Sequence, residues 1–244
     1  MAGQSIGRSL NSIHHTCVDK INEVLKLYIY ADEFFKEATY ELGDKFLQES
    51  NRMEQILSEW RNFYATAGPL NLPFDPEIHL SDIKTLCESS LRKTGEIIMS
   101  LDHSRRDLLC KLSLVYVVGL FEAFFTDSVE QLVSESQLKK FKNLSFKNQV
   151  GYLQNKLGID VDQSQVRTSE IDEFFARRNL LLHCGGVVDK HYIDRVGYSD
   201  YKEGEEIPVD EHYFCRAAYS FIALAGYLYG VFKAKMEGNH GTHS

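Results

Sequence analysis

Residues 107–133 read DLLCKLSLVYVVGLFEAFFTDSVEQLV, and apolar residues occupy nearly every side of the helix that this stretch predicts. A helix of this kind usually lies at the centre of a bundle, because its apolar surface has to be covered from several directions. Glu122 stands alone among phenylalanines and a leucine. We expect it either to have a cationic or hydrogen-bonding partner or to lie on a narrow polar edge that faces water.

The composition of the whole chain agrees with a helical fold. It contains 16 glycines and 4 prolines in 244 residues, fewer chain-breaking residues than a turn-rich β fold needs. Lys and Arg number 27 against 35 Asp and Glu, and the net charge of −8 argues against non-specific binding to nucleic acid or anionic membrane over the whole surface. We therefore expect an all-α fold, a helical bundle with an N-terminal helical extension.

The sequence also indicates the cellular compartment of the protein. No stretch approaches 18 uncharged apolar residues, and the first residues lack the apolar core of a signal peptide. The five cysteines lie far apart, without a CxxC pair. These features predict a soluble, reduced, cytoplasmic protein without membrane association, structural zinc or another metal or cofactor.

Four segments are predicted along the chain. Residues 1–66 form an N-terminal helical segment, 67–81 a connector with three prolines, 82–236 the bundle and 237–244 a disordered tail. Apolar residues recur about every seven positions in the first segment, and we expect this stripe to be core rather than a dimerising coiled coil. Its members are Ile21, Tyr28, Phe35, Leu42, Ile56 and Phe63. A break or kink is expected near Gly43.

Helix ends are predicted from local signals inside the bundle. Asp102 and His103 are expected to interrupt a helix from Asp82, and Ser104 with Asp107 fits a capping box that opens the central helix. A short helix over 149–157 should end at Gly158 in a left-handed conformation. A second capping box, Ser169 with Asp172, starts a helix that stops at Gly185-Gly186.

Residues 139–147, KKFKNLSFK, interleave lysines with two phenylalanines. Such a composition suits a phosphate backbone beside a stacking ring, although a solvated loop face explains it equally well. The candidate RNA-binding cations here are Lys139, Lys140 and Lys142, with Lys190 further along the chain.

The helix before Gly185-Gly186 carries the candidate site. Arg178 and His183 are five positions apart, about 140° around an ideal helix, so they would share a cleft only if the last turn distorts. Asn179 stands between them, and Leu180–Leu182 anchor the helix in the core. The alternative roles are an ion pair between Arg178 and Glu122 and a helix-terminal histidine favoured by the macrodipole.

These residues, ARRNLLLHCGGVVDKHYI, resemble the Arg-Asn-x-x-x-His signature of HEPN (higher eukaryotes and prokaryotes nucleotide-binding) domains. The helices 113–133 and 204–232 resemble the core and closing helices of that fold, so the resemblance covers residues 82–236. It implies a compact helical homodimer that cuts RNA without metal, as a toxin or antiviral defence effector. By this resemblance Arg178 and His183 would be catalytic and Asn179 supporting. Glu122 and Arg177 are further candidate supporting residues on the evidence of their charge and position.

The chemistry can be argued from the side chains alone. Cleavage of RNA through its 2′-hydroxyl needs a proton acceptor, a proton donor for the leaving oxygen and stabilisation of charge on phosphorus. Neutral His183 is suited to accept the proton and Arg178 to bind phosphate oxygens, while a second copy of the chain supplies the acid. The opposing hypothesis is a catalytically silent helical module that binds a protein partner or a nucleotide.

Other residues give weaker signals. Asp172 and Glu173 point in different directions on a helix and are not expected to form a catalytic carboxylate pair. His191 lies between Asp189 and Asp194, and the sequence favours a solvated helix over a metal site there. Cys184 is expected to be a half-buried, unreactive thiol rather than a nucleophile.

Overall fold

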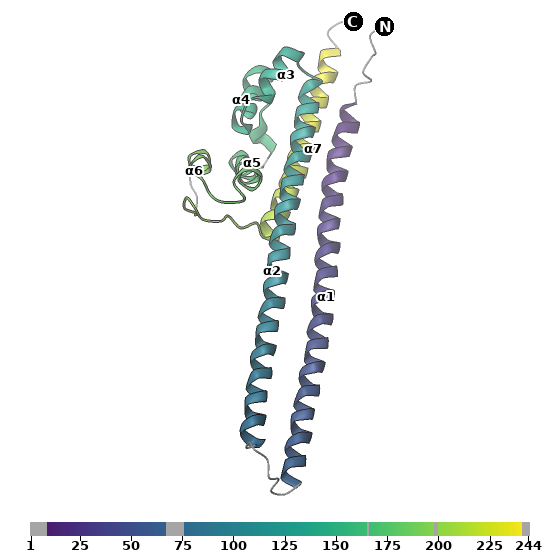
Figure 1. The fold of residues 1–244 in the computed structure, drawn as a ribbon. Coiled ribbons are helices and arrows are strands. Elements are labelled where there is room, and N and C mark those ends of the chain that lie inside the picture. The colour runs from purple at the N-terminus through teal and green to yellow at the C-terminus, as the bar shows by residue number, and fades with distance from the viewer. Residues whose placement is uncertain (1–8, 67–75, 165, 198–199, 241–244) are drawn as a thin grey trace, which may run out of the picture. The chain divides into compact units, whose positions relative to one another are not determined.

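The computed structural model describes residues 9–66, 76–164, 166–197 and 200–240, and within these ranges the chain is all-α, as predicted (Figure 1). The helices are α1 (Leu10–Thr66), α2 (Pro76–Glu130), α3 (Glu135–Lys142), α4 (Phe146–Leu157), a short 3₁₀ helix η1 (Val161–Ser164), α5 (Thr168–His183), α6 (Lys190–Val196) and α7 (Glu211–His240).

Two predicted interruptions are absent. Helix α1 runs continuously through Gly43, and α2 runs through Asp102 and His103, so the capping box at Ser104 does not form. Asp102 lies within 4.0 Å of the guanidinium groups of Arg105 and Arg106, and such pairs within the next turn make a polar residue compatible with a continuing helix.

The predicted segment ends also need correction. Helix α2 begins at Pro76, inside the predicted connector, and proline is compatible with a first helical turn because that turn has no intrahelical acceptor for its amide. Residues 67–75 lie outside the described part of the chain. The predicted tail is helical up to His240 in α7, and α5 starts at Thr168 without the expected side-chain cap.

The chain divides into two compact units, with boundaries between Ile29 and Tyr30 in α1 and between Arg106 and Asp107 in α2. We call them the bundle unit, which contains residues 10–29, 107–130 and α3–α7, and the hairpin unit, Tyr30–Arg106. The start of α1 therefore belongs with the bundle rather than with a separate N-terminal segment. Residues 82–106 belong to the hairpin unit instead of the bundle.

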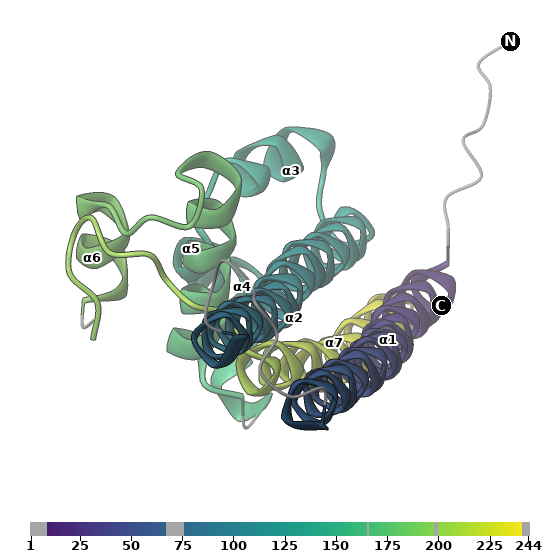
Figure 2. The ribbon, with the colours of Figure 1, turned by 60° about the horizontal axis from the view of Figure 1, so that its bottom comes forward.

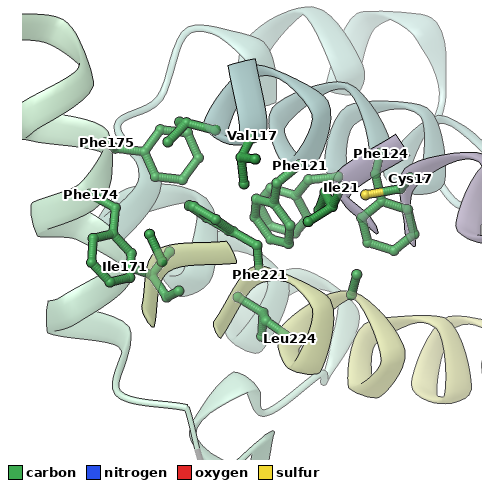
Figure 3. Close-up of a cluster of buried hydrophobic side chains, with 14 of the residues drawn as sticks. Cys17, Ile21, Val117, Phe121, Phe124, Ile171, Phe174, Phe175, Phe221 and Leu224 are labelled. Carbon is green, nitrogen blue, oxygen red and sulfur yellow. The ribbon is translucent and has the colours of Figure 1, made fainter. Parts of the chain in front are cut away.

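The bundle unit is organised around a core of aromatic side chains. Within it α7 lies between α1 and α2 (Figure 2). Ile21 of α1, Phe121 of α2 and Phe221 of α7 are each 0% exposed, and the rings of Phe121 and Phe221 lie 4.7 Å apart (Figure 3). Phe174 and Phe175 bring α5 against the same cluster, so the central position predicted for the 107–133 helix is confirmed.

The smaller helices cover one side of the bundle unit. Helix α4 ends at Gly158 with a φ of 61°, the left-handed ending that was predicted. After α5, the chain reverses at Gly185 and Gly186, which both have positive φ. Backbone hydrogen bonds then join Val188 to Glu205 and Gly186 to Ile207, at 2.8 Å each, and so hold α6 beside α5.

The hairpin unit is built from two antiparallel helical segments. Arg106 contacts Asp32 at 3.2 Å, and Arg105 lies over the ring of Phe35 at 4.6 Å. Among its described side chains only Asp32 is fully buried, so the predicted core stripe is wrong for Leu42 and Ile56, which are exposed. Its exposed large apolar residues are Tyr30, Phe34, Tyr40, Leu42, Leu47, Met53, Ile56, Leu86, Ile97 and Met99.

Two helical stretches, Glu88–Glu130 and Glu211–Glu237, are long and apolar enough to cross a membrane by length and composition. Their most apolar windows contain at most two charged residues, so the sequence prediction that no stretch approaches such a span is too strict. Core helices of soluble proteins have the same composition, and 44% and 39% of the two windows are buried inside the protein. Composition is therefore weak evidence for a membrane span.

Candidate functional site

Helix α5 supports the candidate site rigidly. Its buried residues are Ile171, Phe174, Phe175, Ala176, Arg177 and Leu180. The helix ends at His183, and Cys184 donates its backbone amide to the carbonyl of Leu180 at 2.8 Å. Because one face of α5 is packed against the core, the backbone from which its polar side chains project is held in place.

Arg178 pairs with Glu122, as the sequence suggested for a bundle ion pair. Its Nη2 donates to Glu122 Oε2 at 2.6 Å, and its side chain is only 16% exposed. The Glu122 side chain is 52% exposed, so this carboxylate has a partner and also faces water. Arg178 Nε is buried and has no hydrogen-bond partner among the described residues. The pair therefore fixes one end of the guanidinium and leaves Nε unused.

His183 and Asn179 line one pocket of about 250 Å³ at the C-terminal end of α5. We call it the histidine pocket. His183 is exposed, while Ala176 and Leu180 of the same helix are buried beneath it. The pocket also contains residues that the sequence analysis did not join to the site, namely Cys184, Asp189, His191, Tyr192 and Arg195.

Within one chain, Arg178 and His183 face different surroundings. Arg178 contacts Glu122 on α2 and is not among the residues that line the histidine pocket. Residues of α6 form the other wall of that pocket. The distortion that would bring both into one cleft is not present. This divergence agrees with the angle of about 140° expected for five positions on an ideal helix.

A helix cap and two interactions between the helices shape the histidine pocket. Asp189 caps α6 by accepting from the backbone amide of Tyr192 at 2.7 Å, and its other carboxylate oxygen accepts from Cys184 Sγ at 3.5 Å. Arg195 donates to both carboxylate oxygens of Asp172, at 2.7 and 3.3 Å. The walls of the pocket are therefore tied together by side chains of both helices.

Arg177, predicted as a supporting cation, is instead part of a buried polar network. Its side chain is 9% exposed, its Nε donates to Glu173 Oε1 at 2.7 Å, and its Nη1 donates to the carbonyl of Pro208 at 2.8 Å. Tyr192 and Tyr213 donate their hydroxyls to the Glu173 carboxylate. Burial, followed by the charge of Glu173, raises the pKa of both tyrosines above the usual range. A pocket of about 350 Å³ opens beside this network.

The predicted basic patch is only partly present. Lys139, Lys140 and Lys142 are exposed in the last turn of α3, and Lys190 is exposed at the start of α6. Helices α3 and α6 lie apart in both views, so these lysines do not form one continuous surface (Figures 1 and 2). Phe141 and Phe146 are buried in the core, so the interpretation of stacking rings is wrong.

The weaker candidates are settled by their contacts. Asp172 and Glu173 have different partners, Arg195 and Arg177, as expected for residues that point apart on a helix. Partial burial and the bond to Asp189 raise the pKa of the Cys184 thiol, which favours the unreactive form. Among the residues that the structure describes, no three His, Cys, Asp or Glu side chains gather as a metal site requires.

In comparisons with known proteins, the chain matches no family, no curated protein and no solved structure.

Proposed function

We propose that the chain is a metal-independent RNA endonuclease of the HEPN type, which cuts RNA through its own 2′-hydroxyl. The observation that carries this proposal is the histidine pocket: an exposed imidazole, His183, stands beside the Asn179 amide on a helix that the core holds rigid. An imidazole has a proton-accepting and a proton-donating ring nitrogen, so it can serve as a general base towards a substrate in the pocket.

A homodimer is part of the proposal. Arg178 and His183 of one chain face different sides of α5, so both meet one phosphate most simply where a two-fold axis brings two copies of α5 together. Arg178 is then the donor for a phosphate oxygen, while Glu122 holds its Nη2. The dimer cleft thereby combines a proton acceptor with a phosphate-binding group.

The net charge of −8 constrains RNA binding. Arg178 and Lys190 supply the local positive charge, and the lysines of α3 add to it at a separate place on the surface. Each cation that contacts a phosphate releases counterions on binding, so we expect RNA binding to weaken as salt is raised, by an amount set by the number of such contacts. The resemblance to HEPN proteins suggests a cytoplasmic toxin or antiviral effector, restrained or triggered by an antitoxin or sensor protein.

The proposal is tested by cleavage of single-stranded RNA in the presence of EDTA. His183→Ala should lower the rate by about 10²–10⁴-fold, the usual contribution of a general acid or base. His212→Gln, an exposed histidine at the start of α7 that lines neither pocket described above, should leave the rate unchanged. Equal rates for His183→Ala and the parent chain would refute the catalytic assignment, and loss of activity with EDTA would indicate a metal nuclease.

A catalytically silent module that binds a protein or nucleotide is the second candidate, and the ion pair between Arg178 and Glu122 favours it. In that case the parent chain cuts no RNA, and Arg178→Ala lowers only the stability of the bundle unit. Removing one partner of a buried pair costs about 3–5 kcal/mol, but the half-exposed Glu122 makes a smaller loss the expectation here. Measuring cleavage and urea unfolding on the same Arg178→Ala preparation separates the two candidates.

A further inference from the structure

The histidine pocket contains a second histidine from the same chain. His191 lies in the first turn of α6, is exposed, and lines the pocket together with His183. The sequence places the two residues eight positions apart and gives no sign that they meet, because the Gly185-Gly186 reversal intervenes.

The backbone that carries these two imidazoles is held by the packing of α6 on α5. Tyr192, the neighbour of His191, is 3% exposed and packs with Ala176 and Leu180 in a small apolar cluster. The bonds of Asp189 with Cys184 and of Arg195 with Asp172 tie the two helices at both sides of the pocket. Each histidine thus projects from a backbone that is held in place, as proton transfer to a bound substrate requires.

The size and lining of the pocket suit one ribose phosphate. At about 250 Å³ it is smaller than a site for a drug-sized molecule. Besides the two imidazoles it presents the amide of Asn179 and the guanidinium of Arg195, which already pairs with Asp172. The other titratable groups that face the pocket are Cys184, Asp189 and Tyr192.

We propose that His191 is the general acid of the reaction, acting in the same chain as His183. The inference rests on the proposed function, in which His183 accepts the proton of the 2′-hydroxyl. Oxygen O2′ forms a bond to phosphorus while the bond from phosphorus to O5′ breaks. The 2′-hydroxyl proton moves to His183, and a proton from His191 moves to O5′. The products are a 2′,3′-cyclic phosphate and a 5′-hydroxyl, so atoms and protons balance without a further reactant.

This arrangement differs from the one that the sequence suggested, in which a second copy of the chain supplies the acid. In the same-chain arrangement both proton-transfer groups lie in one pocket, and the dimer contributes phosphate binding through Arg178. The distinction matters because it makes His191 necessary for cleavage, whereas the symmetric arrangement gives it no role.

The test uses two oligoribonucleotides that differ at one linkage, with either oxygen or sulfur at the bridging 5′ position. A thiolate leaves without a proton, so the sulfur substrate does not need a general acid. Cleavage rates are measured with enzyme in excess for the parent chain, His191→Gln, His183→Ala and the exposed control His212→Gln. Thermal unfolding of each variant accompanies the rates.

On the oxygen substrate His191→Gln should lose about 10²–10⁴-fold in rate. On the sulfur substrate it should cut nearly as fast as the parent chain, whereas His183→Ala stays slow on both. The pH–rate profile of the parent should fall on the alkaline side as the acid loses its proton, and His191→Gln should lack this fall. Burial raises the pKa of Tyr192, and partial burial raises that of Cys184, so neither group is expected to cause this fall in rate.

Three other outcomes would overturn either the role of His191 or the proposed function. If His191→Gln cuts the oxygen substrate at the parent rate while His183→Ala does not, the role of His191 is refuted and the proposed function stands. If His191→Gln is slow on both substrates, His191 is not the acid. If the parent chain cuts neither substrate, the proposed function itself fails.

Discussion

The two parts of helix α1 carry similar apolar patterns but differ in what those side chains contact. The apolar stripe up to Tyr28 packs into the bundle unit, where Ile21 is 0% and Tyr28 2% exposed. Beyond Ile29, in the hairpin unit, the same helix leaves Tyr40 76% exposed and Leu47 58% exposed. The first part has α2 and α7 beside it, whereas the second is paired within its unit with one helical segment.

The comparison shows that an apolar stripe specifies helix formation but not burial. A stripe is buried only where enough other elements surround it, and two helices alone leave most of each surface uncovered. The candidate site lies on the unit that has the full core. We therefore expect perturbations of the bundle unit to change stability and activity, and matched perturbations of the hairpin unit to change them far less.

The largest difference should come from truncating an aromatic residue in each unit. Phe121 is fully buried and has ring contacts with Phe124, Phe125, Phe146, Phe175 and Phe221. Phe121→Ala should lower the free energy of unfolding by about 3–5 kcal/mol, because it removes buried surface and leaves a cavity. Tyr40→Ala in the hairpin unit should change it by about 0.5 kcal/mol or less. Urea unfolding followed by circular dichroism measures both, and similar losses for the two variants would contradict the comparison.

A smaller difference in stability is expected between breaking the Arg177–Glu173 pair of the bundle unit and breaking the Arg106–Asp32 pair of the hairpin unit. Arg177→Ala leaves Glu173 buried without its cation and should cost about 3 kcal/mol, with partial recovery in Arg177→Lys. Arg106→Ala in the hairpin unit should cost about 1 kcal/mol or less, because Lys36 remains 2.5 Å from Asp32. The same urea experiment applies. A loss for Arg106→Ala as large as that for Arg177→Ala would mean that the hairpin is as tightly packed as the bundle.

The smallest effect concerns the pH dependence of stability. His14 stacks on Tyr229 at 4.5 Å in the bundle unit, and burial, helped by the charge of His15, lowers its pKa below 6.5. The unfolded chain therefore binds a proton more readily, so the stability is complete above pH 6.5 and declines as the pH falls through 6.5. His14→Phe should flatten the fall of the melting temperature between pH 7 and pH 5.

The matched control is His103→Gln in the hairpin unit, where the side chain is exposed. This variant should keep the acid-side fall of the parent chain. If His14→Phe and the parent have the same dependence on pH, the partial burial of His14 does not lower its pKa as described.

Much of the fold could be predicted because its signals are local. The apolar run at 107–133, the left-handed end at Gly158 and the stop at Gly185-Gly186 each depend on a few neighbouring residues. The continuity of α2 could not be predicted in this way. Asp102 and His103 look like a helix end, but exposure and ion pairing with the following arginines make them acceptable inside a helix.

The candidate site was predictable only where one helix carries it. Arg178, Asn179 and His183 follow from the helix sequence, and the pairing of Arg178 with Glu122 follows from charge among apolar neighbours. The histidine pocket depends on the reversal after α5 and on backbone bonds between residues 186–188 and 204–207, which are distant in sequence. For the same reason the sequence predicts no role for His191 beyond that of a residue on a solvated helix.

The most direct test of the account is the dependence of cleavage on the 2′-hydroxyl. An oligoribonucleotide and its 2′-deoxy counterpart are incubated with the parent chain and with His183→Ala in EDTA, and the ends of the products are analysed. The account predicts that the parent chain cuts only the ribose oligomer, to a 2′,3′-cyclic phosphate and a 5′-hydroxyl, and that His183→Ala is about 10²–10⁴-fold slower. Cleavage of the deoxy oligomer, or equal rates for the two proteins, would contradict it.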